Sequence, residues 1–271
     1  MILSDSPKIQ AFNIDCMEFM KDKPDNFYDL AIVDPPYGIG ECGRSNLSRG
    51  SAAGANKWKD SRNTTGAGIP STQFTPKKWD FKPPTSGYCV ELFRVSKNQI
   101  MWGANHYISN VPFDSSCWVV WDKINGTTDF ADCELAWTSF GSAVRKFTFM
   151  WNGMLQGNMK EKETRIHPTQ KPVKLYRWLL SNYASCKYCK NQGTYYEDVA
   201  GDGGSQMEMA CDSCCRADRN FRILDTHGGS FSSAIACHME GYDLDICELD
   251  EDYFNDAVKR FKLNTIQERL F

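Results

Sequence analysis

An Asp-Pro-Pro-Tyr tetrapeptide at residues 34–37 carries side chains that could bind an amino group. It directly follows the apolar run 28–33, which is typical of a buried strand ending at a rigid turn. Two consecutive prolines fix the backbone and remove its N–H donors, which leaves the Asp34 carboxylate and the Pro35 carbonyl as acceptors. Two acceptors suit an exocyclic NH₂ group, and Tyr37 supplies an aromatic face for a heterocycle. The tetrapeptide therefore predicts an amine-binding site; the alternative is a stiff turn with a surface tyrosine.

A second candidate site lies near the C-terminal end, where a strand, a Gly-rich turn, a helix and another strand follow one another. The turn contains Asp225, Gly228, Gly229 and Ser230, so it places backbone N–H groups and a helix N-terminus beside a ligand. Glu248 ends the next strand, where a carboxylate can accept both ribose hydroxyls of a nucleoside cofactor. Because the turn is not G-x-G-x-x-G, it does not favour a pyrophosphate. The alternative is a plain βα turn whose glycines only permit close packing.

Five of the twelve cysteines crowd between residues 186 and 215. Cys186-x₂-Cys189 and Cys211-x₂-Cys214, separated by 21 residues, match the spacing of a Cys₄ zinc ribbon. Without a secretion signal, the cluster favours a metal site over disulfides, with Cys215 as a substitute ligand or a bystander. We expect a structural zinc in a polar insert over 185–220; the alternative is free or redox-active thiols.

The elements that must position these residues combine strands with helices, and the βαβ order at the C-terminus implies a parallel sheet. Short β-like stretches lie at 98–102, 117–121, 134–138 and 144–150, and apolar residues at helical spacing follow 167–172. Five tryptophans of the middle third stand at strand spacing and are expected in the core; the alternative is that they stack on bases. They are Trp102, Trp118, Trp121, Trp137 and Trp151. Residues 44–78 differ, because seven basic residues and one acid give a charge of +6 with almost no apolar periodicity. We expect 41–82 to be a mobile basic loop; the alternative is a disordered, solvated loop that makes no contacts.

Composition bounds the class of protein. The 271 residues are 41% hydrophobic and 13% aromatic, which suits a packed core and excludes wholesale disorder. No apolar run approaches the roughly 18 residues that a membrane helix needs, and the N-terminus lacks the layout of a signal peptide. The net charge of −3 excludes a generic polyanion binder, although a local basic patch can still hold nucleic acid. We expect a cytoplasmic protein without a membrane partner.

In this order, the motifs resemble those of the DNA amino-methyltransferases that use S-adenosylmethionine, specifically the adenine-N6 type of the β group. The family's Asp/Asn-Pro-Pro-Tyr catalytic motif is matched by Asp34, Pro35, Pro36 and Tyr37, and its ribose-binding acid by Glu248. The catalytic motif comes first and the cofactor motif last, and the resemblance covers about 10–40, 95–184 and 221–262. It implies an α/β, Rossmann-like methyltransferase fold: one domain over 1–271 with a mostly parallel, circularly permuted sheet and the Cys-rich insert.

The same resemblance implies a set of cofactor-binding residues. It rests on the Gly-rich turn, on HPTQKP at 167–172, which resembles the motif at the methionine end of the cofactor, and on an acidic position near its adenine. These residues are Asp15, Thr169, Lys171, Asp225, His227, Gly228, Gly229, Ser230 and Glu248. The chain departs from the family pattern at Phe231, where a further Gly is usual, and at His227, where an aromatic-Gly pair is usual.

The implied reaction moves a methyl group from S-adenosylmethionine to the exocyclic N6 of an adenine flipped out of DNA. Flipping costs a few kcal/mol, which stacking on Tyr37 and hydrogen bonds at Asp34 and Pro35 would offset. Accepting both amino hydrogens opposes delocalisation of the nitrogen lone pair and makes the nitrogen a better nucleophile. Double-stranded DNA is the implied partner, with 103–165 and the basic loop as the recognition region, in a prokaryotic or phage setting. A homodimer and a cognate restriction endonuclease are left open.

Two alternative functions stay open. A cytosine-N4 enzyme performs the same chemistry, and only the Asp before Pro-Pro-Tyr favours adenine, by resemblance. The alternative of another class is a catalytically impaired zinc-ribbon protein that binds nucleic acid, which Phe231 in the cofactor turn suggests.

Overall fold

The computed structural model describes residues 1–40, 77, 79–125, 131–152, 155–184, 194–198, 206–210 and 221–266. Most of the expected basic loop lies outside these ranges, and so do the four cysteines of the expected zinc site. Both therefore stay predictions.

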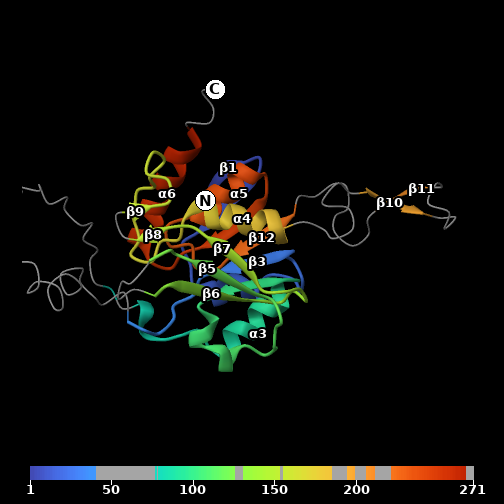
Figure 1. Cartoon of the computed structure of the whole chain (residues 1–271), viewed down its shortest axis with the longest axis horizontal. Helices are drawn as coiled ribbons and strands as arrows, with labels where there is room; N and C mark the ends of the chain where they lie inside the picture. The colour runs from blue at the N-terminus through green and yellow to red at the C-terminus, as the bar shows by residue number, and fades with distance from the viewer. Residues whose placement is uncertain are drawn as a thin grey trace, which may run out of the picture.

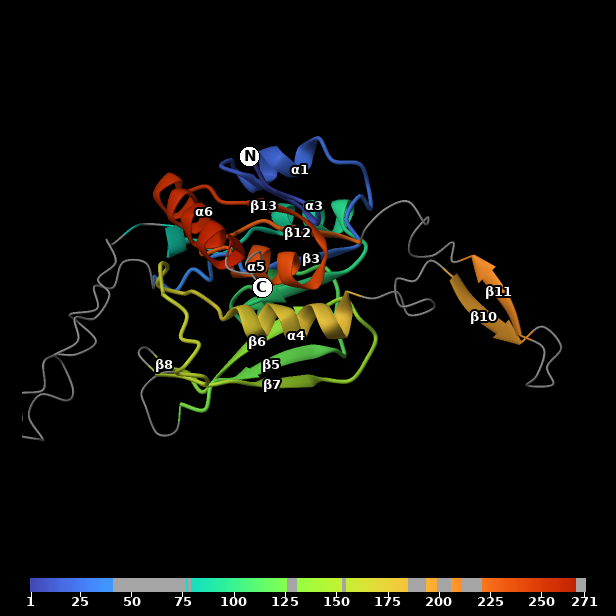
Figure 2. The ribbon, with the colours of Figure 1, turned by 90° about the horizontal axis from the view of Figure 1, so that it is seen from above.

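A mixed sheet of nine described strands forms the centre of the structure, in the order β1-β2-β13-β12-β3-β4-β6-β5-β7. Two short antiparallel hairpins, β8–β9 and β10–β11, stand outside it (Figures 1 and 2). The sheet strands are β1 Ile2–Asp5, β2 Lys8–Phe12, β3 Leu30–Val33, β4 Gln99–Trp102, β5 Trp118–Asp122, β6 Cys133–Thr138, β7 Arg145–Thr148, β12 Arg222–Asp225 and β13 Asp243–Cys247. The hairpin strands are β8 Trp151–Asn152, β9 Leu155–Gln156, β10 Thr194–Asp198 and β11 Gln206–Ala210.

Five neighbouring strands run parallel, so their carboxyl ends meet at one edge of the sheet. They are β2, β13, β12, β3 and β4. The strand β6 runs antiparallel to both β4 and β5, which places the start of β6 and the end of β5 at that same edge. All four residues of β3 are buried, as expected of a strand covered on both faces. The edge thus collects loops from widely separated parts of the chain.

Helices cover both faces of the sheet (Figure 1). On one face α4 (Val173–Tyr183), α5 (Ser232–Glu240) and α6 (Glu251–Ile266) share a core cluster that contains Trp102 and Trp121. On the other face α1 (Cys16–Lys21) and α3 (Ser86–Val95) pack in a second cluster that contains Trp137. These three tryptophans and Trp151 are buried, whereas Trp118 is half-buried, so the expected core position is confirmed for four of the five. Short 3₁₀ turns lie at η2 Trp79–Phe81, η3 Ala104–His106 and η4 Ile108–Asn110.

Local sequence explains where these helices begin and end. Asp15 caps α1, because its carboxylate accepts the N–H groups of Met17 and Glu18 at 2.9 and 3.2 Å. Pro172 precedes the first residue of α4, and Gly241 ends α5 with a φ of +79°. None of the described helices has both the length and the apolar character to cross a membrane.

Candidate active site

A cavity of about 620 Å³ opens at the edge where the parallel strands end. Its wall includes residues that follow β2, β3, β12 and β13, so most of the candidate residues meet here. The candidate residues that line it are Asp15, Asp34, Pro36, Thr169, Lys171, His227, Gly228, Gly229, Ser230 and Glu248. The other three candidates, Pro35, Tyr37 and Asp225, are not among the lining residues.

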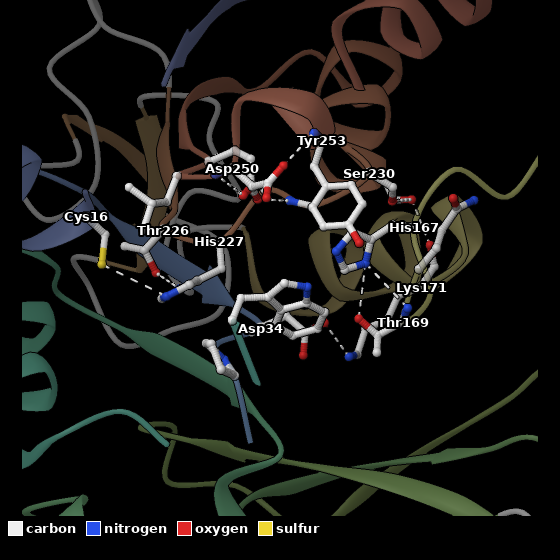
Figure 3. Close-up of a pocket in the computed structure, with 18 of the residues that line it drawn as sticks. Cys16, Asp34, His167, Thr169, Lys171, Thr226, His227, Ser230, Asp250 and Tyr253 are labelled. Atoms are coloured by element: carbon white, nitrogen blue, oxygen red, sulfur yellow. Dashed lines mark hydrogen bonds and ion pairs between the residues drawn. The ribbon is translucent and has the colours of Figure 1, made fainter. Parts of the chain in front are cut away.

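Figure 3 shows how the lining side chains are distributed around the cavity. Cys16, Thr226 and His227 lie on one side, and His167, Thr169 and Lys171 lie on the other, with Asp250 and Tyr253 at the top of the view. Strand-end loops and the segment before α4 therefore face each other across the space.

Glu248, the residue after β13, holds the Gly-rich turn that follows β12. Its Oε2 accepts the N–H of Gly229 at 2.7 Å, and its Oε1 accepts the N–H of Asp250 at 2.8 Å. Burial raises the pKa of this carboxyl, and the two backbone donors oppose that shift. Each carboxylate oxygen can still accept a second hydrogen bond. Glu248 thus has capacity left for hydroxyl donors of a ligand in the cavity.

Gly229 keeps the turn open toward that ligand space. Its φ is +50°, in the left-handed region that favours glycine. A Cβ at this position would stand 3.7 Å from the ring of His167, so it would occupy the gap between the turn and the opposite wall. His227, in the same turn, also departs from the pattern of the resembled family. Burial lowers its pKa to about 4, so this imidazole is neutral at ordinary pH.

Asp225, the last residue of β12, holds the turn through two hydrogen bonds and does not line the cavity. Its Oδ2 accepts the Ser233 hydroxyl at 2.5 Å, and its Oδ1 accepts the N–H of His227 at 3.1 Å. Burial raises the pKa of this carboxyl to about 7. Asp225 therefore ties the end of β12 to the first turn of α5 and does not face the ligand.

Phe231 packs beneath the turn, in the core. Its side chain is fully buried, and its ring meets that of Phe254 edge to face at 5.8 Å between centroids. The backbone of Phe231 has a φ of +58°, a conformation that suits the glycine usual at this position in the resembled family. The ring also explains why residue 228 is glycine, because a Cβ there would come within 2.6 Å of it. Phe231 is not among the cavity-lining residues, so its ring does not narrow the space.

Asp34 belongs to a buried polar network that the sequence did not reveal. Its Oδ2 lies 2.5 Å from Nζ of Lys171, and its Oδ1 accepts the Tyr37 hydroxyl at 2.7 Å. A second anion, Glu134 at the start of β6, places Oε2 3.1 Å from the same Nζ. Glu134 also pairs with Lys123, which follows β5. Cations and anions thus alternate along Lys123, Glu134, Lys171 and Asp34.

The two carboxyls of this network have opposite pKa shifts. Burial raises the pKa of Asp34, with a further rise from Glu134 and an opposing effect from Lys171. Burial also acts to raise the pKa of Glu134, but Lys171 and Lys123 together lower it to about 2. Glu134 is therefore a permanent anion at neutral pH, whereas Asp34 is the carboxyl with the higher proton affinity.

Tyr37 already has a stacking partner in this structure. Its ring lies 5.3 Å from that of His106, centroid to centroid, with 15° between the planes. Gly103 has a φ of +67°, and a Cβ there would come within 2.0 Å of the Tyr37 ring, so only glycine permits this close approach. His106 therefore covers one face of Tyr37, and the expected stacking of a base on this ring stays a prediction.

Three aromatic residues of the cavity wall were missed by the sequence analysis. The ring of His167 lies 4.3 Å from that of Tyr253 and 5.2 Å from that of Trp79, centroid to centroid. Burial lowers the pKa of His167 to about 3, so this imidazole is neutral. The HPTQKP motif pointed to the segment but not to this residue. Trp79 lies within 41–82, the expected basic loop, and Tyr253 has no role assigned from the sequence.

The expected zinc ligands Cys186, Cys189, Cys211 and Cys214 lie outside the described residues. Among the described residues, no group of three or more His, Cys, Asp or Glu side chains is arranged to hold a metal ion. The hairpin β10–β11 lies between the two cysteine pairs in the chain. The zinc site stays a prediction.

The comparisons with known proteins give matches among solved structures only. No family model and no curated protein matches the chain. The M1.HpyAVI–SAM complex has 16% identity, covers 93% of this chain and 98% of its own, and has a TM-score of 0.44. The complex of TTHA0409 from Thermus thermophilus, provisionally named a DNA modification methylase, with S-adenosyl-L-methionine has 12% identity, coverages of 94% and 95%, and a TM-score of 0.46. The cytosine-N4-specific PvuII DNA methyltransferase has 9% identity, coverages of 93% and 86%, and a TM-score of 0.48.

Proposed function

We propose that the protein transfers a methyl group from S-adenosylmethionine to the exocyclic N6 of adenine in DNA. One observation supports this best: Asp34, the candidate amine acceptor, lines the same cavity as Glu248 and the Gly-rich turn, the candidate nucleoside site. These residues follow different parallel strands, and open α/β sheets bind ligands at the carboxyl ends of such strands.

The residues of the cavity fit this cofactor. The volume of about 620 Å³ falls within the roughly 300–1,000 Å³ of typical small-molecule sites. Glu248 would accept the ribose hydroxyls, and Asp15 would face the adenine. Thr169 and Lys171 would lie toward the methionine end. When bound, the cofactor supplies an electrophilic methyl group.

Asp34 would share its two oxygens between the substrate amine and its present partners. Its two oxygens are engaged by Lys171 and by the Tyr37 hydroxyl, and each can accept one further hydrogen bond. Pro35 and Pro36 carry no N–H, so no backbone donor of these residues competes with the amine. An amine held by acceptors keeps its lone pair localised on nitrogen. The contribution of the chain is thus positioning and electrostatics.

The proposed recognition region 103–165 has seven acidic and six basic residues, so its net charge does not favour DNA, but it presents four exposed cations. Arg145, Lys146, Lys160 and Lys162 are exposed there, and cations of this kind contact phosphates without reading sequence. The alternative of an impaired enzyme relied on Phe231, and the core position of its ring removes that reason.

Radiolabelled S-adenosylmethionine and duplex DNA test the proposal directly. The purified chain should label DNA, and mass spectrometry of the digested nucleosides should find N6-methyladenine. Asp34→Ala should lower turnover by roughly 100- to 1,000-fold, as loss of a key preorganised group does. It should bind the cofactor nearly normally. Asp256→Asn, at an exposed position on α6, is the matched control and should keep full turnover.

Each result has a separate meaning. Label in N4-methylcytosine would move the target to cytosine and leave the chemistry standing. Unlabelled DNA from a chain that binds the cofactor would refute DNA as the substrate. Normal turnover by Asp34→Ala would refute the role of Asp34.

A further inference from the structure

We propose that Glu134 is a positioning residue that keeps the Lys171 ammonium paired while Asp34 binds the substrate amine. The inference rests on the proposed function and adds to it a residue from the antiparallel part of the sheet. Glu134 lies at the start of β6, and its partner Lys123 follows β5, so neither belongs to the motifs around Asp34.

The geometry gives Lys171 three partners for its three N–H bonds. Its Nζ lies 2.5 Å from Asp34 Oδ2, 3.0 Å from the Tyr37 hydroxyl and 3.1 Å from Glu134 Oε2. The side chain of Lys171 is 3% exposed, so bulk water has little access to replace a partner that is lost. An ammonium in this position needs an anion at every stage of the reaction.

Binding of an amine changes the demand on Asp34, because its oxygens must serve a new donor. The contact between Asp34 and Lys171 is then weakened. Glu134 compensates for it, because Glu134 contacts the same Nζ and stays ionised. The Tyr37 hydroxyl has a similar choice: it donates to Asp34 at 2.7 Å and lies 3.5 Å from Glu134 Oε2. Both groups that hold Asp34 therefore have Glu134 as a second acceptor.

The charge balance of the network predicts what removal of Glu134 does. Two cations and two anions sum to zero, so Glu134→Gln leaves a net charge of +1. Among the described residues, Asp34 is then the only anion in contact with Lys171. Lys171 holds the Asp34 carboxylate more firmly, so this carboxylate is a poorer acceptor for the amine. The pKa of Asp34 also falls, because Glu134 is one of the groups that raise it.

The other titratable groups around Asp34 stay in place in this variant. They are Tyr37 beside it, Tyr107 after β4, Tyr176 on α4 and Asp225 at the end of β12. A shift of the acidic limb of the pH profile of kcat between wild type and Glu134→Gln therefore reports the removed charge.

The test compares Glu134→Gln, Lys123→Met and the double variant in methyl transfer, across pH. Glu134→Gln should lower kcat at least tenfold, leave the cofactor Kd within twofold, and move the acidic limb of kcat to lower pH. In the double variant Lys171 still lacks its second anion, so kcat should stay within about twofold of that of Glu134→Gln. A purely structural role of the Lys123–Glu134 pair predicts the opposite: the double variant should recover turnover, because it removes the Lys123 charge that Glu134→Gln leaves unpaired.

An unchanged kcat in Glu134→Gln, or a double variant whose kcat returns toward that of wild type, would overturn the inference. If Glu134→Gln does not fold, Lys123→Met decides. Because it removes a cation, it should move the acidic limb to higher pH, and a limb that stays or moves lower counts against Glu134. Wild type is assayed first, since a wild type that does not methylate DNA contradicts the proposed function, whereas the variants bear on Glu134 alone.

Discussion

Asp225 is a buried carboxyl whose ionisation the fold opposes, so replacing it with asparagine should make stability less dependent on pH. Its side chain is 1% exposed, and burial raises its pKa from 3.8 to about 7. Asparagine keeps a carbonyl oxygen for the N–H of His227 and an NH₂ group that can donate to the Ser233 hydroxyl. The substitution therefore removes the titration and preserves the contacts.

The size of the effect follows from the two pKa values. The folded state binds the Asp225 proton more tightly than the unfolded state does. The stability that this proton contributes is complete below the unfolded pKa and is lost as pH rises through the folded pKa. With values of 3.8 and about 7, the loss between pH 5 and pH 8 is roughly 2–3 kcal/mol, at about 1.4 kcal/mol per pKa unit.

Urea unfolding at pH 5 and at pH 8 measures this loss. Wild type should lose roughly 2–3 kcal/mol more than Asp225→Asn between the two pH values, and contributions from other groups cancel in the difference. Asp256→Asn, which changes an exposed carboxylate on α6, should behave like wild type. Equal pH dependence in wild type and Asp225→Asn would refute the argument that burial controls Asp225.

Three further substitutions test the frame of the cavity. Glu248→Gln should weaken cofactor binding by about 1.5–3 kcal/mol, the range for a hydrogen bond to a charged group, as measured by calorimetry. Phe231→Gly should relieve about 1–2 kcal/mol of left-handed backbone strain but lose about 3–5 kcal/mol of core packing. Urea unfolding should therefore show net destabilisation, and a stabilised variant would contradict this. Arg260→Met should destabilise by about 3–5 kcal/mol, because it leaves the Glu163 carboxylate without its partner at 2.7 Å. Adding Glu163→Gln should recover much of that loss, and no recovery would argue against the pair.

The sequence predicted the part of the site that lies directly after apolar strands. Residues 28–33 and the two strands of the C-terminal βαβ unit are short apolar runs, each followed by Pro, Gly or an acid. The structure has β3 at the first of these runs, and β12, α5 and β13 at the βαβ unit. The parallel pairing of β12 with β13 confirms the expected parallel sheet. Because parallel strands end at one edge, Asp34 and Glu248 could be expected to be neighbours from the sequence alone.

Sequence reasoning could not find Glu134 and Lys123. Both lie about 90 or more residues from Asp34 in the chain, within an antiparallel region whose strand order no local pattern specifies. Glu134 reaches the site because β6 runs antiparallel to β4, which turns its first residues toward the carboxyl edge. A carboxylate at the start of a strand looks like an ordinary surface residue until this pairing is known.

Lys171 connects the two halves of the candidate site. Its ammonium pairs with Asp34, while its backbone carbonyl accepts the hydroxyl of Ser232, the first residue of α5, at 2.7 Å. Arg260 donates to that same hydroxyl oxygen at 3.0 Å and to the carbonyl of Ser230 at 2.6 Å, which fixes the Gly-rich turn to α6. The proposed amine site and the proposed cofactor turn therefore share one chain of buried contacts. We therefore expect a substitution that shifts the turn to shift the Lys171 backbone as well and, through its ammonium, the Asp34 carboxylate.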